Sequence, residues 1–421
     1  MSTQLLPDPR VREASVPRGL TALARRALLG ALGKIADGEL TVLEAGSRLE
    51  FGARATDGLR TTIEVRDPRF WAEVAFGGSV AAGESYIQGD WQCTDLTQLI
   101  RLMLRNGAAL AGLEGGIARL ASPLRRGLHW LHRNSRRGSR RNIAAHYDLG
   151  NDFFRLMLDE TMAYSCAIYP EPGASLHAAQ LHKFDTICRS LDLGPDDELL
   201  EIGTGWGGLA LHAARHYGCR VTTTTISAEQ HAYAAAAIRR AGLESRVRLL
   251  NEDYRDLTGT YDKLVSVEMI EAVGHQYLDT YFAACSRLLR PHGAMLLQAI
   301  TIQDQLYARA LGAVDFIQKF VFPGGFIPAV SAMLDSVRRV TDLKLFHLAD
   351  IGPHYATTLA DWRRNFHAEL GAVRALGYPE TFVRLWDYYL SYCEGGFIER
   401  QLGDVQMLLT KPANRRTPLA A

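Results

Sequence analysis

The stretch Leu199–Gly208, LLEIGTGWGG, decides the fold of this chain. An apolar run leads into closely spaced glycines at positions 203, 205, 207 and 208, and helical spacing of apolar residues follows over Leu209–Ala214. A strand, a tight turn and a helix start in this order let backbone N–H groups approach a nucleotide-like ligand. Because glycine also serves in ordinary turns, this stretch alone leaves a purely structural turn open as an alternative.

The segments after this stretch alternate between helix and strand patterns. Ser227-Ala228-Glu229-Gln230 predicts a capped helix that ends near Gly242. β-branched and apolar runs predict further strands at 219–226, 246–250, 261–269 and 293–302, the last after a turn at 290–293. Strands that alternate with helices at this spacing predict a parallel, doubly wound sheet, so the predicted fold class is α/β.

The acidic residue of a dinucleotide site is missing from its usual place. A Rossmann site for NAD puts an acid about 20 residues beyond the glycines, on the ribose. Here the second strand ends at Thr225-Ile226, and the nearest acid is Glu229. The pattern therefore favours a nucleoside ligand held by hydroxyl and amide groups over NAD.

Composition and charge exclude several classes of protein. The 421 residues suffice for two or more domains, and 47 Lys and Arg against 46 Asp and Glu leave a formal net charge of +1, so no bulk field recruits nucleic acid. Six cysteines without zinc or disulfide spacing predict no metal site and a reducing cytoplasm. Since no apolar run approaches the roughly 18 residues of a membrane span and no signal-peptide core is seen, a lipid substrate would be reached from the membrane surface.

The chain divides into three predicted parts. Residues 1–120 form a smaller α+β domain, with strand candidates at 40–44, 47–53 and 59–66 and a helix at 67–76. Its aromatic cluster is expected to be core, with a lipid contact as the alternative: Phe70, Trp71, Phe76, Tyr86 and Trp91. Residues 142–421 form the larger domain, in which helical, apolar segments at 304–339 and 357–393 interrupt the sheet before strands at 343–349 and 404–410.

An arginine-rich linker, residues 121–141, joins the two domains. It carries seven arginines and no acid: Arg125, Arg126, Arg133, Arg136, Arg137, Arg140 and Arg141. Such runs are usually solvated linkers. The alternative is a surface that docks on anionic lipid headgroups, with Trp130 and the neighbouring leucines in the interface. Nucleic-acid binding is not expected, because aromatics are few and the rest of the chain is charge-balanced.

From His146 onward the chain resembles the S-adenosylmethionine-dependent cyclopropane-fatty-acyl-phospholipid synthases and the related mycolic acid cyclopropane synthases. The matching pieces occur in one order: HYDLGNDFF (146–154), AYSCA (163–167), EIGTGWG (201–207), TISAEQ (225–230), DYR (253–255), MIE (269–271), FPGG (322–325) and GGF (395–397). The segment 83–91 resembles the N-terminal domain of the full-length bacterial synthases. The resemblance implies a Rossmann-like class I methyltransferase domain with helical lipid-binding insertions, preceded by a smaller α+β N-terminal domain.

The resemblance also implies ten residues that bind S-adenosylmethionine. Tyr164 and Ser165 fall at its methionine end, and Glu201 meets its amino group. The other seven lie under the ligand, near its ribose or near its adenine: Gly203, Gly205, Thr225, Ile226, Gln230, Asp253 and Tyr254.

For catalysis, the resemblance implies a bicarbonate ion that acts as general base on a carbocation. The ion would lie in a polar nest made of Cys166, Glu271, Gln298, the Ile300 backbone and Tyr355. Gln298 stands where the family usually has histidine, so it can donate a hydrogen bond but carries no charge. Glu268 stands in place of a glycine. If bicarbonate is not the base, Glu268 or Glu271 is the next candidate.

These inferences together predict a cyclopropane-fatty-acyl-phospholipid synthase. Such an enzyme would add a methylene group across the cis double bond of a phospholipid acyl chain, as a homodimer on the cytoplasmic face of the membrane. One alternative is a related lipid methyltransferase that leaves a methyl-branched or methylene chain. The other is a lipid-binding protein with a vestigial cofactor fold.

Overall fold

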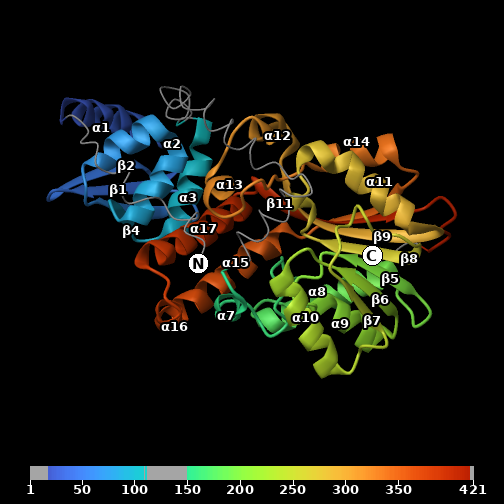
Figure 1. Ribbon diagram of the computed structural model, residues 1–421. Coiled ribbons are helices and arrows are strands. Elements are labelled where there is room, and N and C mark those ends of the chain that lie inside the picture. Colours follow the sequence, from blue (N-terminus) through green and yellow to red (C-terminus); the bar gives the residue numbers. More distant parts are fainter. Residues whose placement is uncertain (1–17, 109, 111–148, 418–421) are drawn as a thin grey trace.

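A computed structural model describes residues 18–108, 110 and 149–417 (Figure 1). Within these ranges the chain forms a four-stranded sheet and a seven-stranded sheet, with helices between them. The predicted linker 121–141, both of its boundaries, and the first residues of the HYDLGNDFF motif, His146 and Tyr147, lie outside the described residues. Among the described helices, none is both long and apolar enough to span a bilayer.

The smaller sheet belongs to the N-terminal unit, residues 18–105. Its strands follow the order β2-β1-β3-β4, with β1 and β3 parallel. The elements are α1 (Arg18–Leu32), β1 (Gly38–Glu44), β2 (Ser47–Ala53), β3 (Arg60–Val65), α2 (Arg69–Gln88), β4 (Trp91–Cys93) and α3 (Leu96–Arg105). The three predicted strands are confirmed. Helix α2 runs twelve residues past the predicted end at 76, because a positive φ of 65° at Gly78 kinks the helix without ending it.

The predicted aromatic cluster of this unit is core. Phe70, Trp71, Tyr86 and Trp91 are each less than a tenth exposed, and neighbouring rings meet at centroid distances of 5.0 to 5.9 Å. Phe76 is half-buried against the same cluster. The cluster continues into the helices of the larger unit, so the two units share one apolar core.

The larger sheet has the order β10-β11-β9-β8-β5-β6-β7. Its strands are β5 (Glu198–Ile202), β6 (Arg220–Thr224), β7 (Val247–Leu250), β8 (Tyr261–Val267), β9 (Leu289–Ile302), β10 (Lys344–Asp350) and β11 (Leu402–Thr410). Neighbouring strands from β7 to β9 are parallel, and only β11 runs antiparallel to its neighbours. The predicted α/β fold with a doubly wound, Rossmann-like sheet is confirmed.

Two local predictions in this sheet need correction or refinement. The turn expected at 290–293 lies inside β9, which begins at Leu289, and appears as an irregularity in its pairing with β8. Ser227 caps α10 (Ala228–Ala241) through a bond from the Gln230 backbone, and the helix ends at Gly242 as expected. The Gln230 side chain takes no part in this cap, because its oxygen accepts a hydrogen bond from the Thr225 hydroxyl.

Helices cover both faces of the larger sheet. The connections carry α7 (Asn151–Arg155), α8 (Leu176–Leu191), α9 (Gly208–His212) and α11 (Leu278–Leu288). The predicted helical insertions are α12 (Asp304–Leu311), α13 (Phe316–Phe320) and α14 (Val330–Val340) after β9, and α15 (Gly352–Ala368), α16 (Leu370–Ala375) and α17 (Glu380–Ile398) before β11. Figure 1 shows α15 and α17 between the two sheets, and α17 packs on α15, α2 and α3.

Candidate active site

One cavity of about 470 Å³ begins at the carboxyl ends of β5, β6 and β8 and continues beneath the insertion helices. All ten residues expected to bind S-adenosylmethionine line it: Tyr164, Ser165, Glu201, Gly203, Gly205, Thr225, Ile226, Gln230, Asp253 and Tyr254. They come together because parallel strands end at one edge of the sheet, where ligands of such folds bind.

The backbone of the glycine loop forms one wall of the cavity. Gly203 has a φ of +102°, and a Cβ built on it would come within 3.2 Å of the Met269 Cβ. The Gly203 and Thr204 amides bond to the Thr224 carbonyl at 3.1 and 3.0 Å, which ties the loop to β6. A side chain here would fill the space in which a ligand can approach the backbone.

Polar side chains surround this loop. Glu201 is buried and accepts a 2.5 Å hydrogen bond from the Thr223 hydroxyl, and burial raises its pKa to about 8. The Thr225 hydroxyl donates to Gln230 at 3.0 Å. The Asp253 carboxylate accepts two bonds from Arg255, at 2.8 and 2.6 Å. A glycine cradle, hydroxyl and amide groups and a carboxyl group fit a nucleoside that carries an amino acid.

A loop that precedes α8 closes the cavity from the opposite side. The Tyr164 hydroxyl lies 2.8 Å from that of Tyr389 on α17. Lys183 donates to the Ser165 hydroxyl at 2.7 Å and is fully buried, which lowers its pKa. No local pattern around Lys183 marked it in the sequence.

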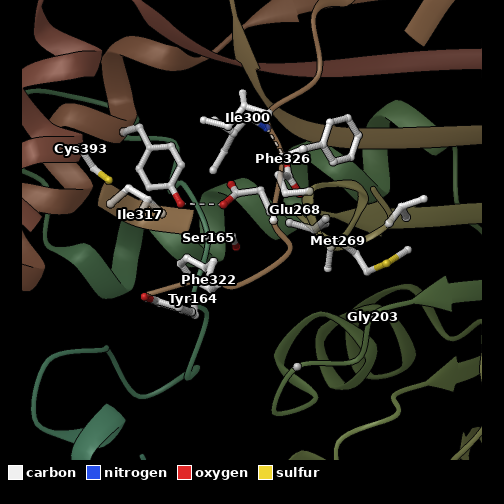
Figure 2. Close-up of a pocket in the computed structure, with 18 of the residues that line it drawn as sticks. Tyr164, Ser165, Gly203, Glu268, Met269, Ile300, Ile317, Phe322, Phe326 and Cys393 are labelled. Atoms are coloured by element: carbon white, nitrogen blue, oxygen red, sulfur yellow. Dashed lines mark hydrogen bonds between the residues drawn. The ribbon is translucent and has the colours of Figure 1, made fainter. Parts of the chain in front are cut away.

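A buried nest of carboxyl groups lies further along the same cavity, with Glu268 at its centre (Figure 2). One oxygen of Glu268 accepts bonds from the Cys166 amide and the Gln298 side-chain amide, both at 2.8 Å. The other oxygen accepts a 2.6 Å bond from the Tyr355 hydroxyl. Glu268 has a φ of +47°, a conformation that costs a non-glycine residue roughly 1–2 kcal/mol. The three hydrogen bonds hold the side chain in place despite this strain.

Two more carboxyl groups adjoin Glu268. Glu271 Oε1 accepts a 2.7 Å bond from the Ile300 amide, and its buried Oε2 has no partner among the described residues. Burial, with the nearby Glu268 charge, raises the pKa of Glu271 to about 8. Asp404 on β11 is fully buried behind Gln298, 3.3 Å from its side-chain amide. Burial and Glu268 raise the pKa of Asp404 well above its usual range.

The structure therefore brings together all five residues expected to hold bicarbonate, but around the carboxyl groups of Glu268 and Glu271. Cys166 and Gln298 are fully buried behind Glu268, and they do not line the cavity. Burial also raises the pKa of the Cys166 thiol well above its usual range. Glu268 accepts bonds from the Cys166 backbone amide, the Gln298 side chain and the Tyr355 hydroxyl, and Glu271 accepts one from the Ile300 amide. Among the described residues, Glu271 Oε2 is the one nest oxygen that lines the cavity without a partner. A further anion would have to displace the Glu268 carboxyl group from the other donors, so the nest as it stands does not fit a bound bicarbonate.

Comparison with known proteins places this chain in a family. The family model for mycolic acid cyclopropane synthetase matches residues 134–407. The chain belongs to this family. It is 36% identical to the tuberculostearic acid methyltransferase UfaA1 of Mycobacterium tuberculosis, over 94% of each chain. It is 37% identical to the cyclopropane-fatty-acyl-phospholipid synthase of Escherichia coli, over 83% of this chain and 87% of that protein.

Solved structures of the family agree. The cyclopropane synthase MmaA2 of Mycobacterium tuberculosis matches with a TM-score of 0.61 at 29% identity, over 65% of this chain and 98% of that one. The mycolic acid cyclopropane synthase CmaA1, solved with S-adenosylhomocysteine, matches with the same score at 30% identity and the same coverage. As a member of the cyclopropane synthase family, this chain is an S-adenosylmethionine-dependent methyltransferase.

Sequence reasoning missed the central residue of the family site in this chain. Glu268 stood out as an acid in place of a glycine and as one of two alternative bases, but not as the group at the centre of the nest. Lys183 and Asp404 gave no signal, because neither belongs to a recognised motif: Lys183 lies 18 residues from Ser165, and Asp404 lies 106 residues from Gln298.

Proposed function

We propose that this enzyme adds a methylene group from S-adenosylmethionine across the cis double bond of a phospholipid acyl chain and forms a cyclopropane ring. The observation that carries the proposal is the continuity of the cavity. The glycine loop, the carboxyl nest and an apolar wall from α13 and α17 all line the same space. A long alkyl chain needs such a wall, because pockets for apolar ligands are lined by aromatic and aliphatic side chains.

The apolar wall of the cavity has two functions in this reaction. When bound, S-adenosylmethionine supplies an electrophilic methyl group, and its transfer to the alkene leaves a carbocation on the acyl chain. Tyr164, Phe322 and Tyr389 line the cavity beside the nest, so they exclude water and offer ring faces to the cation. The Glu268 carboxyl oxygens face the same space and can stabilise a developing positive charge.

We infer that Glu268 itself takes the proton, in place of bicarbonate. The added methyl loses a proton to a Glu268 oxygen, and the freed C–H electron pair closes the three-membered ring. The two Glu268 oxygens accept three hydrogen bonds, whereas Glu271, with its pKa raised to about 8, is protonated at neutral pH. Glu268, whose oxygens act only as acceptors here, is therefore the group that we propose as the base.

A second product is supported by the likeness to UfaA1, which extends over 94% of each chain. If a hydride shifts along the acyl chain before the proton leaves, the same steps give a methylene-bearing chain instead of a ring. Both products have the same mass, so their separation needs NMR. The intact glycine loop and nest oppose the remaining alternative, a carrier without catalysis.

We also propose that the enzyme works at the cytoplasmic membrane surface as a homodimer. A phospholipid substrate resides in the bilayer, and the described helices include none that could cross it. The arginine-rich segment that would support docking lies outside the described residues.

The test uses purified protein, S-adenosylmethionine and vesicles of a cis-unsaturated phospholipid. The fatty esters should gain the mass of one CH₂ group, with cyclopropane protons in the NMR spectrum and one S-adenosylhomocysteine per ring. Vinylic methylene protons would favour the second product. Unchanged esters in vesicles of both anionic and neutral phospholipids would contradict both.

A further inference from the structure

The cavity does not end at the insertion helices but reaches the N-terminal unit. Ile100 and Leu104, one turn apart on α3, line it together with the glycine loop and the nest. The facing wall is one side of α17, at helical spacing: Tyr389, Tyr392, Cys393, Gly396 and Phe397. Figure 2 shows Gly203 and Cys393 on opposite sides of Glu268, so an alkyl chain that passes the nest from the glycine loop runs toward α3.

Helix α3 is held against α17 at close range. A Cβ built on Gly395 would come within 2.7 Å of the Ile100 Cγ2 atom, so only glycine allows this approach. Helices α2 and α13 are equally close, since a Cβ built on Gly83 of α2 would lie 2.5 Å from the Phe316 ring of α13. Since backbones this close cannot slide without a clash, α3 forms a fixed wall.

Polar contacts hold the other edge of α3. The Thr97 hydroxyl donates to Glu394 at 2.9 Å, and Arg101 and Arg105 donate to the two oxygens of Glu399 at 2.7 and 2.8 Å. Thr97, Arg101 and Arg105 are spaced four residues apart, so their polar groups lie on one face of α3, toward α17. The two α3 residues that line the cavity are both apolar, as a hydrocarbon chain requires.

The cavity reaches the surface beside α3. Leu311, at the end of α12, is 39% exposed, Ala313 is exposed and Leu104 is half-buried, and all three line the cavity. Toward the nest, by contrast, Tyr355 and Phe397 are buried. An apolar opening between α3 and α12 is therefore the way in for a chain that has to reach Glu268.

We propose that α3 and the end of α12 form the entrance for the acyl chain, and that Leu104 helps to select which double bond reaches the nest. The inference rests on the proposed function in that the ligand is an acyl chain. It makes the N-terminal unit part of the substrate site, because the distance from this entrance to Glu268 sets how much chain lies between the ester and the reacting alkene.

The test compares Leu104→Trp with Met103→Trp, the neighbouring α3 residue, which is half-buried but does not line the cavity. Oleate binding is measured by calorimetry. Turnover is measured on vesicles that contain two positional isomers of one phospholipid, with the double bond nearer to or farther from the ester. Leu104→Phe serves as a milder variant if Leu104→Trp lowers the melting temperature.

Leu104→Trp should weaken oleate binding about tenfold and change the ratio of the two products, since a small change in an apolar pocket has effects of this size. Met103→Trp should leave both unchanged, and S-adenosylhomocysteine binding should persist in all variants. Equal effects of the Leu104 and Met103 variants would overturn the inference. If the wild type converts neither isomer, the proposed function fails, and the oleate measurement still decides whether Leu104 lies at an entrance.

Discussion

The glycine loop and the carboxyl nest lie in one cavity but are built in opposite ways. The loop residues follow one another along the chain at the end of β5, and their geometry is a property of that short segment. The nest draws Cys166, Glu268, Gln298, Tyr355 and Asp404 from five separate segments. One end of the cavity is thus a local structure, and the other depends on the whole fold. The consequence is that the cofactor end can stay recognisable while the chemistry of the nest changes.

The largest expected effect comes from the base itself. Glu268→Gln keeps the shape of the side chain but removes the proton acceptor, so turnover should fall by about 100-fold or more while S-adenosylhomocysteine affinity stays within a few-fold. Glu252→Gln, at the glycine-loop end of the same cavity, is the matched control and should remain active. Near-normal turnover of Glu268→Gln would show that another group is the base.

Glu268→Gly separates the resident carboxylate from an external ion. The substitution frees the Cys166, Gln298 and Tyr355 donors, so added bicarbonate should restore part of the lost activity in a concentration-dependent way. The wild type should not respond to bicarbonate in degassed, bicarbonate-depleted buffer. If added bicarbonate raises the activity of the wild type but not that of Glu268→Gly, the ion is the base after all.

Gly203→Ala should break the other end of the cavity. Alanine at a φ of +102° is strained by about 1–3 kcal/mol, and its Cβ would press on Met269. We expect S-adenosylhomocysteine affinity to fall at least about tenfold by calorimetry, and 1.4 kcal/mol corresponds to that factor. Gly371→Ala, where no neighbour lies within 4 Å of the added Cβ, should bind the ligand normally. Oleate should still bind to both variants.

Glu271 offers a smaller, pH-dependent effect on stability. Its pKa is about 8 in the folded chain against 4.5 for an ordinary glutamate, so the folded state holds the proton more tightly. The stability contributed by that bound proton is complete below pH 4.5 and is lost as pH rises toward 8. Glu271→Gln, which mimics the protonated form, should therefore melt higher than the wild type at pH 8, with the gap narrowing toward pH 5. A gap that does not change with pH would contradict the raised pKa.

The smallest effect concerns the contact between the two units. Glu399→Gln weakens the ion pairs with Arg101 and Arg105, which are partly exposed, so we expect a loss of about 1 kcal/mol in urea unfolding. S-adenosylhomocysteine binding should not change, because Glu399 lies outside the cavity lining. A large loss of ligand affinity would mean that the glycine loop depends on the docking of α3 after all.

The sequence by itself determined the sheet, the glycine loop and the residues that surround it. Apolar runs, the Ser227 cap and the glycines act within a few residues, and the carboxyl ends of parallel strands must meet, so the sheet and its ligand-binding edge could be predicted from local patterns. The family resemblance then placed Thr225, Gln230 and Tyr254 in one cavity, which they line. The five nest residues were also chosen correctly as neighbours, by resemblance. That three of their donors bond to Glu268 was not predicted, since hydrogen-bond partners follow from packing across the fold.

Only the tertiary structure decided that Glu268 fills the nest, because its strained backbone and three donors come from segments far apart in the chain. The same holds for Lys183, which has no sequence neighbour to mark it, and for Leu104, which looks like an ordinary core leucine of a helix. Helix α3 lines the cavity because Gly395 lets two helix backbones approach, and that approach exists only once both units are folded together. Local patterns determine elements, whereas contacts between distant elements determine the chemistry of this site.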